Sequence, residues 1–132
     1  MSQENLELTR RGVDAHNRRD LDAFAALCTA DVEWCPSMAG AIDGTSYTGR
    51  DGMERYFEHY DETFDGFRVE VDEYRAVGDR VLALGRLEAT GRGSGIPVST
   101  PMGAVSEFRD GKMSRTRIYL DQAEALRAAA SE

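Results

Sequence analysis

The sequence predicts an α+β domain in which helices from the first half of the chain cover one face of an antiparallel sheet. Helical spacing of apolar residues prevails up to about residue 64, and from Phe67 onward apolar and charged residues alternate. The period of the pattern thus changes from about 3.6 to about 2, as expected where half-buried strands follow helices. Short turns separate the later segments, and strands that follow one another through hairpins pair antiparallel. This order excludes a parallel nucleotide-binding fold.

The first two helices are predicted from an apolar stripe and a capping residue. The stripe of the first helix consists of Leu6, Thr9, Val13 and His16. Asp20 is suited to the N-cap of a short second helix, because its carboxylate can accept hydrogen bonds from free backbone N–H groups. The apolar residues of that second helix are Leu21, Phe24, Ala25, Leu27 and Cys28. Cys28 is expected to be inert packing there.

A short strand, a loop and a third helix follow. The β-prone run Val32-Glu33-Trp34-Cys35 ends at Pro36 and predicts a brief strand. Residues 37–49 are rich in Gly, Ser and Thr, which is typical of a loop. A helix is expected from about residue 51 to residue 64. Its broad apolar face consists of Met53, Tyr56, Phe57, Tyr60 and Phe64.

Four longer strands and a terminal helix complete the expected order. The alternation from Phe67 to Val71 marks the first of these strands, and Gly78-Asp79 is typical of a two-residue hairpin turn. Asp121, followed three residues later by Glu124, resembles a capping box that opens a helix. The remaining strands are expected over about residues 80–90, 97–108 and 113–120, and the helix over about residues 122–129.

Length and charge restrict the classes of function. The 132 residues predict one domain, 1–132, because domains typically contain roughly 100–200 residues. Asp and Glu number 24 against 16 Lys and Arg, and the formal net charge is −8. An acidic surface repels phosphate backbones and anionic headgroups, so no nucleic-acid or membrane partner is expected. The chain has no apolar run of the roughly 18–20 residues that span a membrane, and no signal-peptide core, so a cytoplasmic location is expected.

Neither the cysteines nor the histidines predict a metal or redox site. Cys28 and Cys35 are too few for a disulfide framework, and their spacing is not that of a redox or zinc motif. The two histidines, His16 and His59, do not form a HExxH-like pattern. We therefore expect no metal and no organic cofactor.

Five short motifs, spread in order over the chain, resemble those of the SnoaL-like polyketide cyclases. The motifs are RDLDA (19–23), DVEW (31–34), TGR (48–50), FRDGK (108–112) and YLDQ (119–122). This family is part of the nuclear transport factor 2-like superfamily, together with ketosteroid isomerases and limonene epoxide hydrolases. The resemblance implies a curved sheet that helices close into a cone, with an apolar pocket inside, and it implies a homodimer.

Strand parity indicates which side chains would line this pocket. One face of a strand carries Met102, Ala104, Ser106 and Phe108. On the next strand Thr116, Ile118 and Leu120 would face the same space, unless a bulge reverses their direction. His16 and aromatic residues of the helices would complete the lining, in an apolar pocket typical of small-molecule sites. The expected substrate-binding residues are Trp34, Met53, Tyr60, Met102, Ser106, Thr116 and Ile118.

The chain lacks residues that two reactions of the superfamily need. A ketosteroid isomerase needs a carboxylate base and an oxyanion hole made of a tyrosine and a protonated acid. The matching positions hold Pro36, Gly12 and Ala104, which excludes that mechanism. The limonene epoxide hydrolases resemble this chain in an arginine flanked by two carboxylates. Arg86 and Glu88 could supply the arginine and one carboxylate, because they share one face of a strand. The second carboxylate would fall at Ile118, which cannot serve. The alternative interpretation is that Arg86 and Glu88 form an exposed ion pair.

The SnoaL-like cyclases, which close a ring by an intramolecular aldol reaction, resemble the chain most closely. One acidic or basic side chain in an apolar pocket suffices for this reaction. His16 is the first candidate because its ordinary pKa of about 6.5 makes it a base near neutral pH; the alternative is a hydrogen-bonded histidine at the edge of the core. Asp121 is the second, with helix capping as its alternative. Tyr56 could turn its hydroxyl inward to orient a carbonyl, or be a core aromatic.

The sequence thus predicts a protein that binds a small, largely apolar, carbonyl-bearing compound. It would isomerise, cyclise or hydrate this compound by acid–base chemistry without a cofactor. The alternative is a non-catalytic ligand-binding or dimerisation module of the same fold, which the missing carboxylates favour.

Overall fold

The computed structural model describes residues 2–36 and 46–131 of the chain. Most of the loop expected over residues 37–49 lies outside the described residues. The order of elements agrees with the predicted order except for a short strand at Tyr47–Thr48, which lies in the segment expected as a loop, and the bounds are mostly within a few residues of those expected. The elements are α1 (Ser2–Arg18), α2 (Leu21–Ala26), β1 (Cys28–Cys35), β2 (Tyr47–Thr48), α4 (Gly49–Thr63), β3 (Phe64–Val77), β4 (Arg80–Gly91), β5 (Pro97–Arg109), β6 (Lys112–Tyr119) and α5 (Gln122–Ala130).

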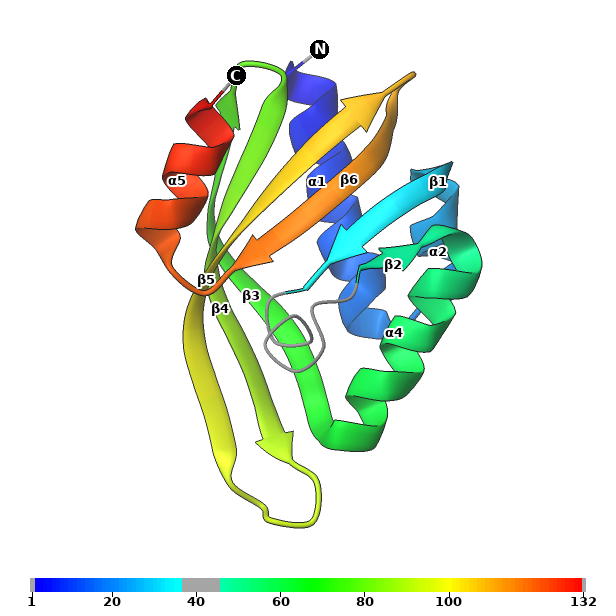
Figure 1. Ribbon diagram of the computed structural model, residues 1–132, viewed down its shortest axis with the longest axis vertical. Coiled ribbons are helices and arrows are strands. Elements are labelled where there is room, and N and C mark those ends of the chain that lie inside the picture. Colours follow the sequence, from blue (N-terminus) through cyan, green and yellow to red (C-terminus); the bar gives the residue numbers. More distant parts are fainter. Residues whose placement is uncertain (1, 37–45, 132) are drawn as a thin grey trace.

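The strands form one curved, six-stranded sheet in the order β2-β1-β6-β5-β4-β3 (Figure 1). β3 to β6 pair antiparallel through consecutive connections, as predicted. The sheet is not wholly antiparallel, however, because β1 pairs with β6 in parallel. β1 leaves the helical part of the chain and joins the edge of the finished meander, so hairpin geometry does not set its direction. The short strand β2 then pairs antiparallel with β1 at the sheet edge.

The prediction that Cys28 belongs to the second helix was wrong. Cys28 begins β1 and does not belong to α2, which ends at Ala26. Long-range pairing explains the difference, because the backbone N–H of Met113 in β6 donates to the Leu27 carbonyl at 2.9 Å and Cys28 pairs with Met113. Cys28 is nevertheless buried, and burial raises the pKa of its thiol to about 12. A thiol with so high a pKa is inert packing.

Helices cover both faces of the sheet. α1, α2 and α4 lie against one face and α5 lies against the other (Figure 1). β4 serves both cores by strand alternation: Ala83 and Leu87 face the main core, whereas Leu82 packs against α5 in a separate cluster with Val105 and Ala125. The smaller cluster consists of Leu82, Val105, Ala125 and Ala129.

One arginine joins the first half of the chain to the sheet. Arg19 follows α1 with a positive φ of 57°, and its guanidinium donates to the carboxylate of Asp61 in α4 and to the backbone carbonyls of His16 and Phe67. The side chain is 22% exposed, so these charge-assisted bonds are partly shielded from water. Arg19 therefore fixes the end of α1 against α4 and β3.

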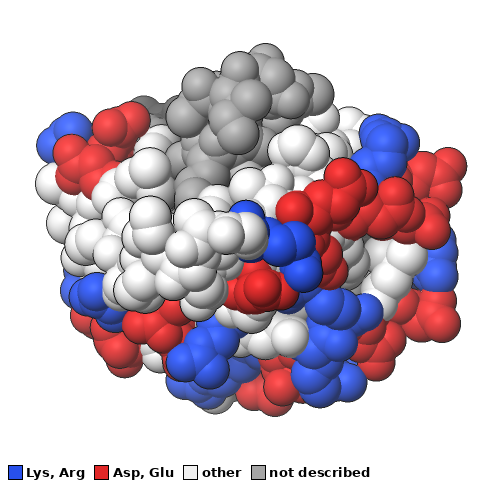
Figure 2. All heavy atoms as spheres, turned by 90° about the horizontal axis from the view of Figure 1, so that it is seen from below, with Lys and Arg blue, Asp and Glu red and all other residues white. Residues whose placement is uncertain are grey.

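The surface is mixed in charge. Seen from below, acidic and basic side chains are interspersed (Figure 2), and exposed pairs such as Arg92–Asp65 (2.8 Å) and Arg68–Glu88 (3.1 Å) join β3 to β4 and its following turn. Such exposed pairs contribute little to stability. In the part of the chain that the structure describes, no helix has the length and apolarity needed to cross a membrane.

Close packing between β3 and β4 requires a glycine at position 85. A β-carbon there would lie 1.9 Å from the Glu70 carbonyl oxygen and 2.8 Å from the Cα of Val71. Both neighbours are backbone atoms, beside a bulge between Val71 and Glu73, and they cannot rotate away. We expect Gly85→Ala to lower the free energy of unfolding by at least about 2 kcal/mol, measured by urea denaturation.

Gly91→Ala is the matched control. A β-carbon at Gly91 would lie 2.5 Å from the Ser94 hydroxyl oxygen, the end of an exposed side chain that can move. Gly91→Ala should lower the free energy of unfolding much less than Gly85→Ala does. Equal losses for the two variants would show that the approach of β3 to β4 is not what position 85 requires.

Candidate functional site

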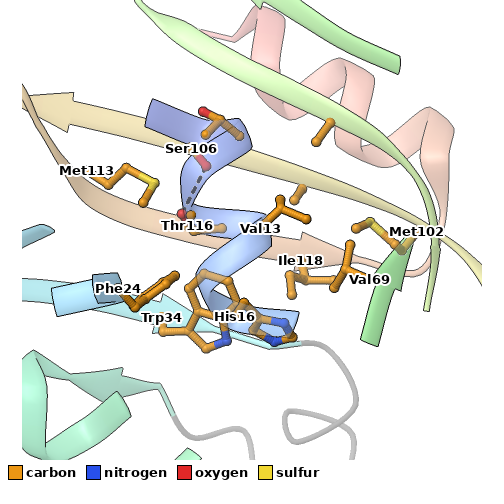
Figure 3. Close-up of a pocket in the computed structure, with 14 residues that line it drawn as sticks. Val13, His16, Phe24, Trp34, Val69, Met102, Ser106, Met113, Thr116 and Ile118 are labelled. Carbon is orange, nitrogen blue, oxygen red and sulfur yellow. Dashed lines mark hydrogen bonds between the residues drawn. The ribbon is translucent and has the colours of Figure 1, made fainter. Parts of the chain in front are cut away.

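A small cavity lies between α1 and the inner face of the sheet (Figure 3). Its volume is about 30 Å³, enough for water but far below the roughly 300–1,000 Å³ of sites for drug-sized ligands. The walls are mainly apolar, and the described lining residues include no carboxylate. The lining residues are Thr9, Gly12, Val13, His16, Phe24, Trp34, Val69, Ala83, Met102, Ala104, Ser106, Met113, Thr116 and Ile118.

The strands place their lining residues by alternation and register. Met102, Ala104 and Ser106 on β5 are two residues apart and share the inner face. Ala104 pairs with Ile118, and Ser106 pairs with Thr116, so β6 adds its inner residues directly opposite. These five positions are among the seven that strand parity predicts for the inner face. The other two are not among the described lining residues: Phe108 follows a register shift in β5, and Leu120 lies beyond the end of β6 and is exposed.

His16 is buried at the cavity and both of its ring nitrogens are hydrogen-bonded. The residue is 1% exposed. Nε2 lies 2.8 Å from the Tyr56 hydroxyl, and Nδ1 lies 3.2 Å from the side-chain oxygen of Asn17. A buried imidazole with both nitrogens satisfied avoids the cost of an unpaired polar group.

Asn17 determines which nitrogen of His16 carries the proton. Its amide donates to the Val69 carbonyl and its oxygen accepts from the Val69 N–H, both at 2.9 Å. This pair of bonds fixes the amide orientation, so the atom facing His16 Nδ1 is an oxygen and Nδ1 must be the donor. Nε2 is then an acceptor, and it receives the hydrogen bond of the Tyr56 hydroxyl.

Burial keeps His16 neutral at physiological pH. The pKa of the imidazole is lowered from 6.5 to about 4, mainly by loss of hydration and in part by the nearby charge of Arg19. The hydrogen bond to Asn17 and the charge of Asp61 oppose this shift. His16 therefore offers a lone pair rather than a positive charge at pH 7.

Tyr56 is the partner of His16 and is fully buried. Burial is the main cause that raises the pKa of its phenol, so the hydroxyl keeps its proton and acts as a donor. The indole of Trp34 lies 5.5 Å from the Tyr56 ring and 5.8 Å from the His16 ring, between centroids. Within residues 2–36 and 46–131 the buried indole nitrogen has no hydrogen-bond partner, but the Trp34 side chain opposes part of the rise in the pKa of Tyr56.

The aromatic face of α4 stands behind the cavity wall. Tyr56 and Tyr60 are both buried, with ring centroids 4.7 Å apart, and Met53 is 1% exposed. None of these three is among the described lining residues. They support the wall at His16 and Trp34 from outside, so of the residues expected to bind substrate the cavity brings together Trp34, Met102, Ser106, Thr116 and Ile118.

Asp121 lies away from the cavity. Its carboxylate oxygen accepts from the backbone N–H groups of Ala123 (2.9 Å) and Glu124 (3.3 Å) and caps α5, on the opposite face of the sheet. The side chain is exposed. The capping alternative therefore accounts for its contacts.

Arg86 and Glu88 also face away from the cavity. They share the side of β4 that carries Leu82, the side that faces α5. Arg86 is exposed, and its Nε lies 3.7 Å from the Glu88 carboxylate. The pair matches the exposed alternative.

Sequence reasoning missed several functional neighbours. Asn17 and Arg19 are polar residues at the end of a helix, and no spacing rule distinguishes them from solvated residues. Phe24 and Val69 were expected as apolar residues of a helix and a strand, but not as cavity walls. Strand alternation is the signal that could have found Val69, because this residue lies between charged neighbours in β3.

No group of three His, Cys, Asp or Glu side chains that could hold a metal ion is present among residues 2–36 and 46–131.

The lowered pKa of His16 makes stability depend on pH. Because the unfolded imidazole binds a proton near 6.5 and the folded one near 4, this contribution is complete above about pH 6.5 and is lost as the pH falls toward 4. At roughly 1.4 kcal/mol per pKa unit, the loss is about 3 kcal/mol. Urea denaturation between pH 7 and pH 4 measures it.

The variant His16→Gln cannot titrate and isolates this contribution from those of the carboxylates. We expect its free energy of unfolding to fall less steeply with decreasing pH than that of the unmodified chain. His59→Gln is the control, because His59 is exposed, and it should retain the full slope. Parallel curves for all three proteins would contradict a buried, neutral His16.

Comparison with known proteins places the chain among proteins of the same fold. A solved nuclear transport factor 2-like protein of unknown function from Burkholderia pseudomallei is 25% identical, with a TM-score of 0.79 over 97% of this chain and 98% of the other. TerC, co-crystallised with polyporic acid, is 23% identical with a TM-score of 0.78 over 97% and 99% of the chains. A candidate polyketide cyclase from Xanthomonas campestris is 23% identical with a TM-score of 0.76 over 98% of each chain.

Sequence comparison identifies the family. No curated protein matches the chain. The model of the SnoaL-like domain matches residues 9–116, which is most of the chain. The match includes α2, α4 and β1 to β5 in full, the second half of α1 and the first part of β6. The sheet order and the helices on its inner face agree with this match. The chain therefore belongs to the SnoaL-like domain family.

Proposed function

We propose that the protein binds a small, largely apolar, carbonyl-bearing compound in the cavity beside His16 and acts on it by acid–base chemistry without a cofactor. The observation that carries this proposal is a neutral imidazole, 1% exposed, that lines an apolar cavity. A buried lone pair in such surroundings is suited to accept a proton from carbon. That TerC was co-crystallised with polyporic acid supports a small-molecule role for the fold.

The low pKa of His16 restricts the substrate. A base whose conjugate acid has a pKa of about 4 takes a proton from carbon efficiently only where the carbon is itself acidic. A carbon between two carbonyl groups meets this condition, because both carbonyls share the charge of the resulting enolate. The proposed substrate therefore contains a 1,3-dicarbonyl unit or an equivalent activated carbon.

The proton transfer requires that substrate replace Tyr56 at Nε2. The C–H bond breaks, its proton forms the Nε2–H bond, and its electron pair remains as the enolate. Tyr56 lies behind the cavity wall, so its hydroxyl, once released from Nε2, must turn toward the cavity before it donates to the enolate oxygen. Return of the proton to another carbon isomerises the compound. Alternatively, the enolate carbon attacks a second carbonyl and closes a ring, and the alkoxide oxygen that forms takes the proton back from Nε2.

Substrate binding also requires that the cavity widen. About 30 Å³ cannot hold a dicarbonyl compound, so lining side chains must move on binding. Met102 and Met113 are unbranched and adapt their shape more readily than the other lining residues. Their movement would enlarge the space between β5, β6 and α1.

Exchange of carbon-bound hydrogen tests the proposal directly. The protein should accelerate exchange of the C3 hydrogens of pentane-2,4-dione with deuterium oxide above the buffer rate at pH 7, followed by proton NMR. His16→Gln should return the rate to the buffer value, since the glutamine amide is not a base. His59→Gln should keep the acceleration, because that imidazole is exposed.

A non-catalytic binding module is the second candidate. The observation that favours it is that both nitrogens of His16 are already hydrogen-bonded and that the described cavity lining has no carboxylate. Binding of the dione without any acceleration of exchange would support this candidate and contradict catalysis by His16.

The proposal includes a homodimer, which rests on the family resemblance. Sedimentation velocity at micromolar concentration should give about twice the chain mass of 14.6 kDa. His16→Gln should not change this mass, because the residue is buried inside one chain. A species of single-chain mass at all concentrations would contradict the dimer without affecting the proposed chemistry.

A further inference from the structure

We propose that the hydroxyl pair formed by Ser106 and Thr116 is a donor site that recognises a neutral carbonyl oxygen of the ligand. This inference rests on the proposed function, because it assigns a second polar group of the same cavity to the bound molecule. It makes the pair a determinant of specificity and not a proton acceptor.

The pair is built into the sheet and faces the cavity. Ser106 and Thr116 are opposite each other across β5 and β6, and their hydroxyl oxygens lie 2.9 Å apart. They are 2% and 4% exposed, and both line the cavity. Figure 3 shows the hydrogen-bonded pair set apart from the rings of His16 and Trp34.

A count of hydrogen atoms shows that one donor of the pair has no acceptor. Two hydroxyl groups carry two hydrogens, and the bond between them uses one. Among the described residues no further partner accepts the second hydrogen. Thr9, the other lining hydroxyl, differs because it donates to the Asn5 carbonyl of its own helix at 2.8 Å.

The second hydrogen therefore requires an acceptor from outside the chain. Buried hydroxyl donors in proteins are nearly always satisfied, by protein groups, water or ligands. The cavity has room for a water molecule, and a ligand oxygen that enters the cavity can replace it.

The surroundings of the pair select a neutral acceptor. No Lys, Arg or carboxylate is among the described lining residues, so an ionised carboxylate would be buried without a counter-charge. A ketone or similar carbonyl oxygen accepts one hydrogen bond at a much smaller desolvation cost. The ligand is thus a compound with a neutral carbonyl at the hydroxyl pair and its activated carbon at His16, joined by an apolar body.

The test compares two probes of similar shape, pentane-2,4-dione and 2,4-dimethylpentane, by NMR titration of the Ile118 methyl signals. The preference is the ratio of the two affinities. Ser106→Ala combined with Thr116→Val removes both donors, and the preference for the dione should fall about five- to tenfold, as expected for one hydrogen bond. Thr116→Ser retains both hydroxyls and should retain the preference.

Thr116→Val alone has nearly the same shape as the unmodified chain and leaves Ser106 with one hydroxyl hydrogen, which is free to donate to the ligand. This variant should therefore retain most of the preference. An unchanged preference in the double variant overturns the inference. So does a crystal structure of the dione complex of the unmodified protein in which the pair binds water only, and this structure decides if the double variant does not fold.

The readouts separate this inference from the proposed function. His16→Gln should abolish the acceleration of hydrogen exchange, whereas the Ser106→Ala and Thr116→Val double variant should lower the preference for the dione. If the dione binds with the expected preference but exchange is not accelerated, the inference holds and catalysis fails. If neither probe binds to the unmodified protein, both are overturned.

Discussion

The burial of one neutral imidazole organises the candidate site. His16 can lie inside the protein because Asn17 satisfies one ring nitrogen and Tyr56 satisfies the other. Asn17 is in turn held by two backbone bonds to Val69, so the same contacts attach α1 to β3. Buried polar groups are costly when unpaired. The same hydrogen bonds therefore fix the position of the imidazole and its tautomer, and they allow the burial that lowers its pKa.

The sheet separates this site from the charged groups of the chain. Strand alternation sends Ala83 and Leu87 of β4 to the main core and sends Leu82, with Arg86 and Glu88, to the face that α5 partly covers. The acidic surface therefore does not extend into the described cavity. What remains inside is an apolar enclosure with an imidazole and a hydroxyl pair, a set of groups that can accept one proton and donate one hydrogen bond to a neutral oxygen.

Much of the fold could be predicted because local patterns determine it. The change of period at Phe67, the turn at Gly78-Asp79 and the N-cap at Asp20 depend on neighbouring residues, and the structure has each of them, with Asp20 accepting from Ala23 at 3.0 Å. The parallel pairing of β1 with β6 and the extension of β1 to Cys28 were not predictable in this way. They depend on backbone bonds between segments about 80 residues apart.

The sequence by itself determined the residue types at the site: Pro36, Gly12 and Ala104 exclude one mechanism, and parity brings Ser106 and Thr116 to the inner face. The tertiary structure alone decided how these groups are used. Whether His16 is charged depends on its burial and on Asn17, Tyr56 and Arg19 around it. Burial and hydrogen bonding are properties of residues that meet only after folding, so no pattern along the chain can supply them.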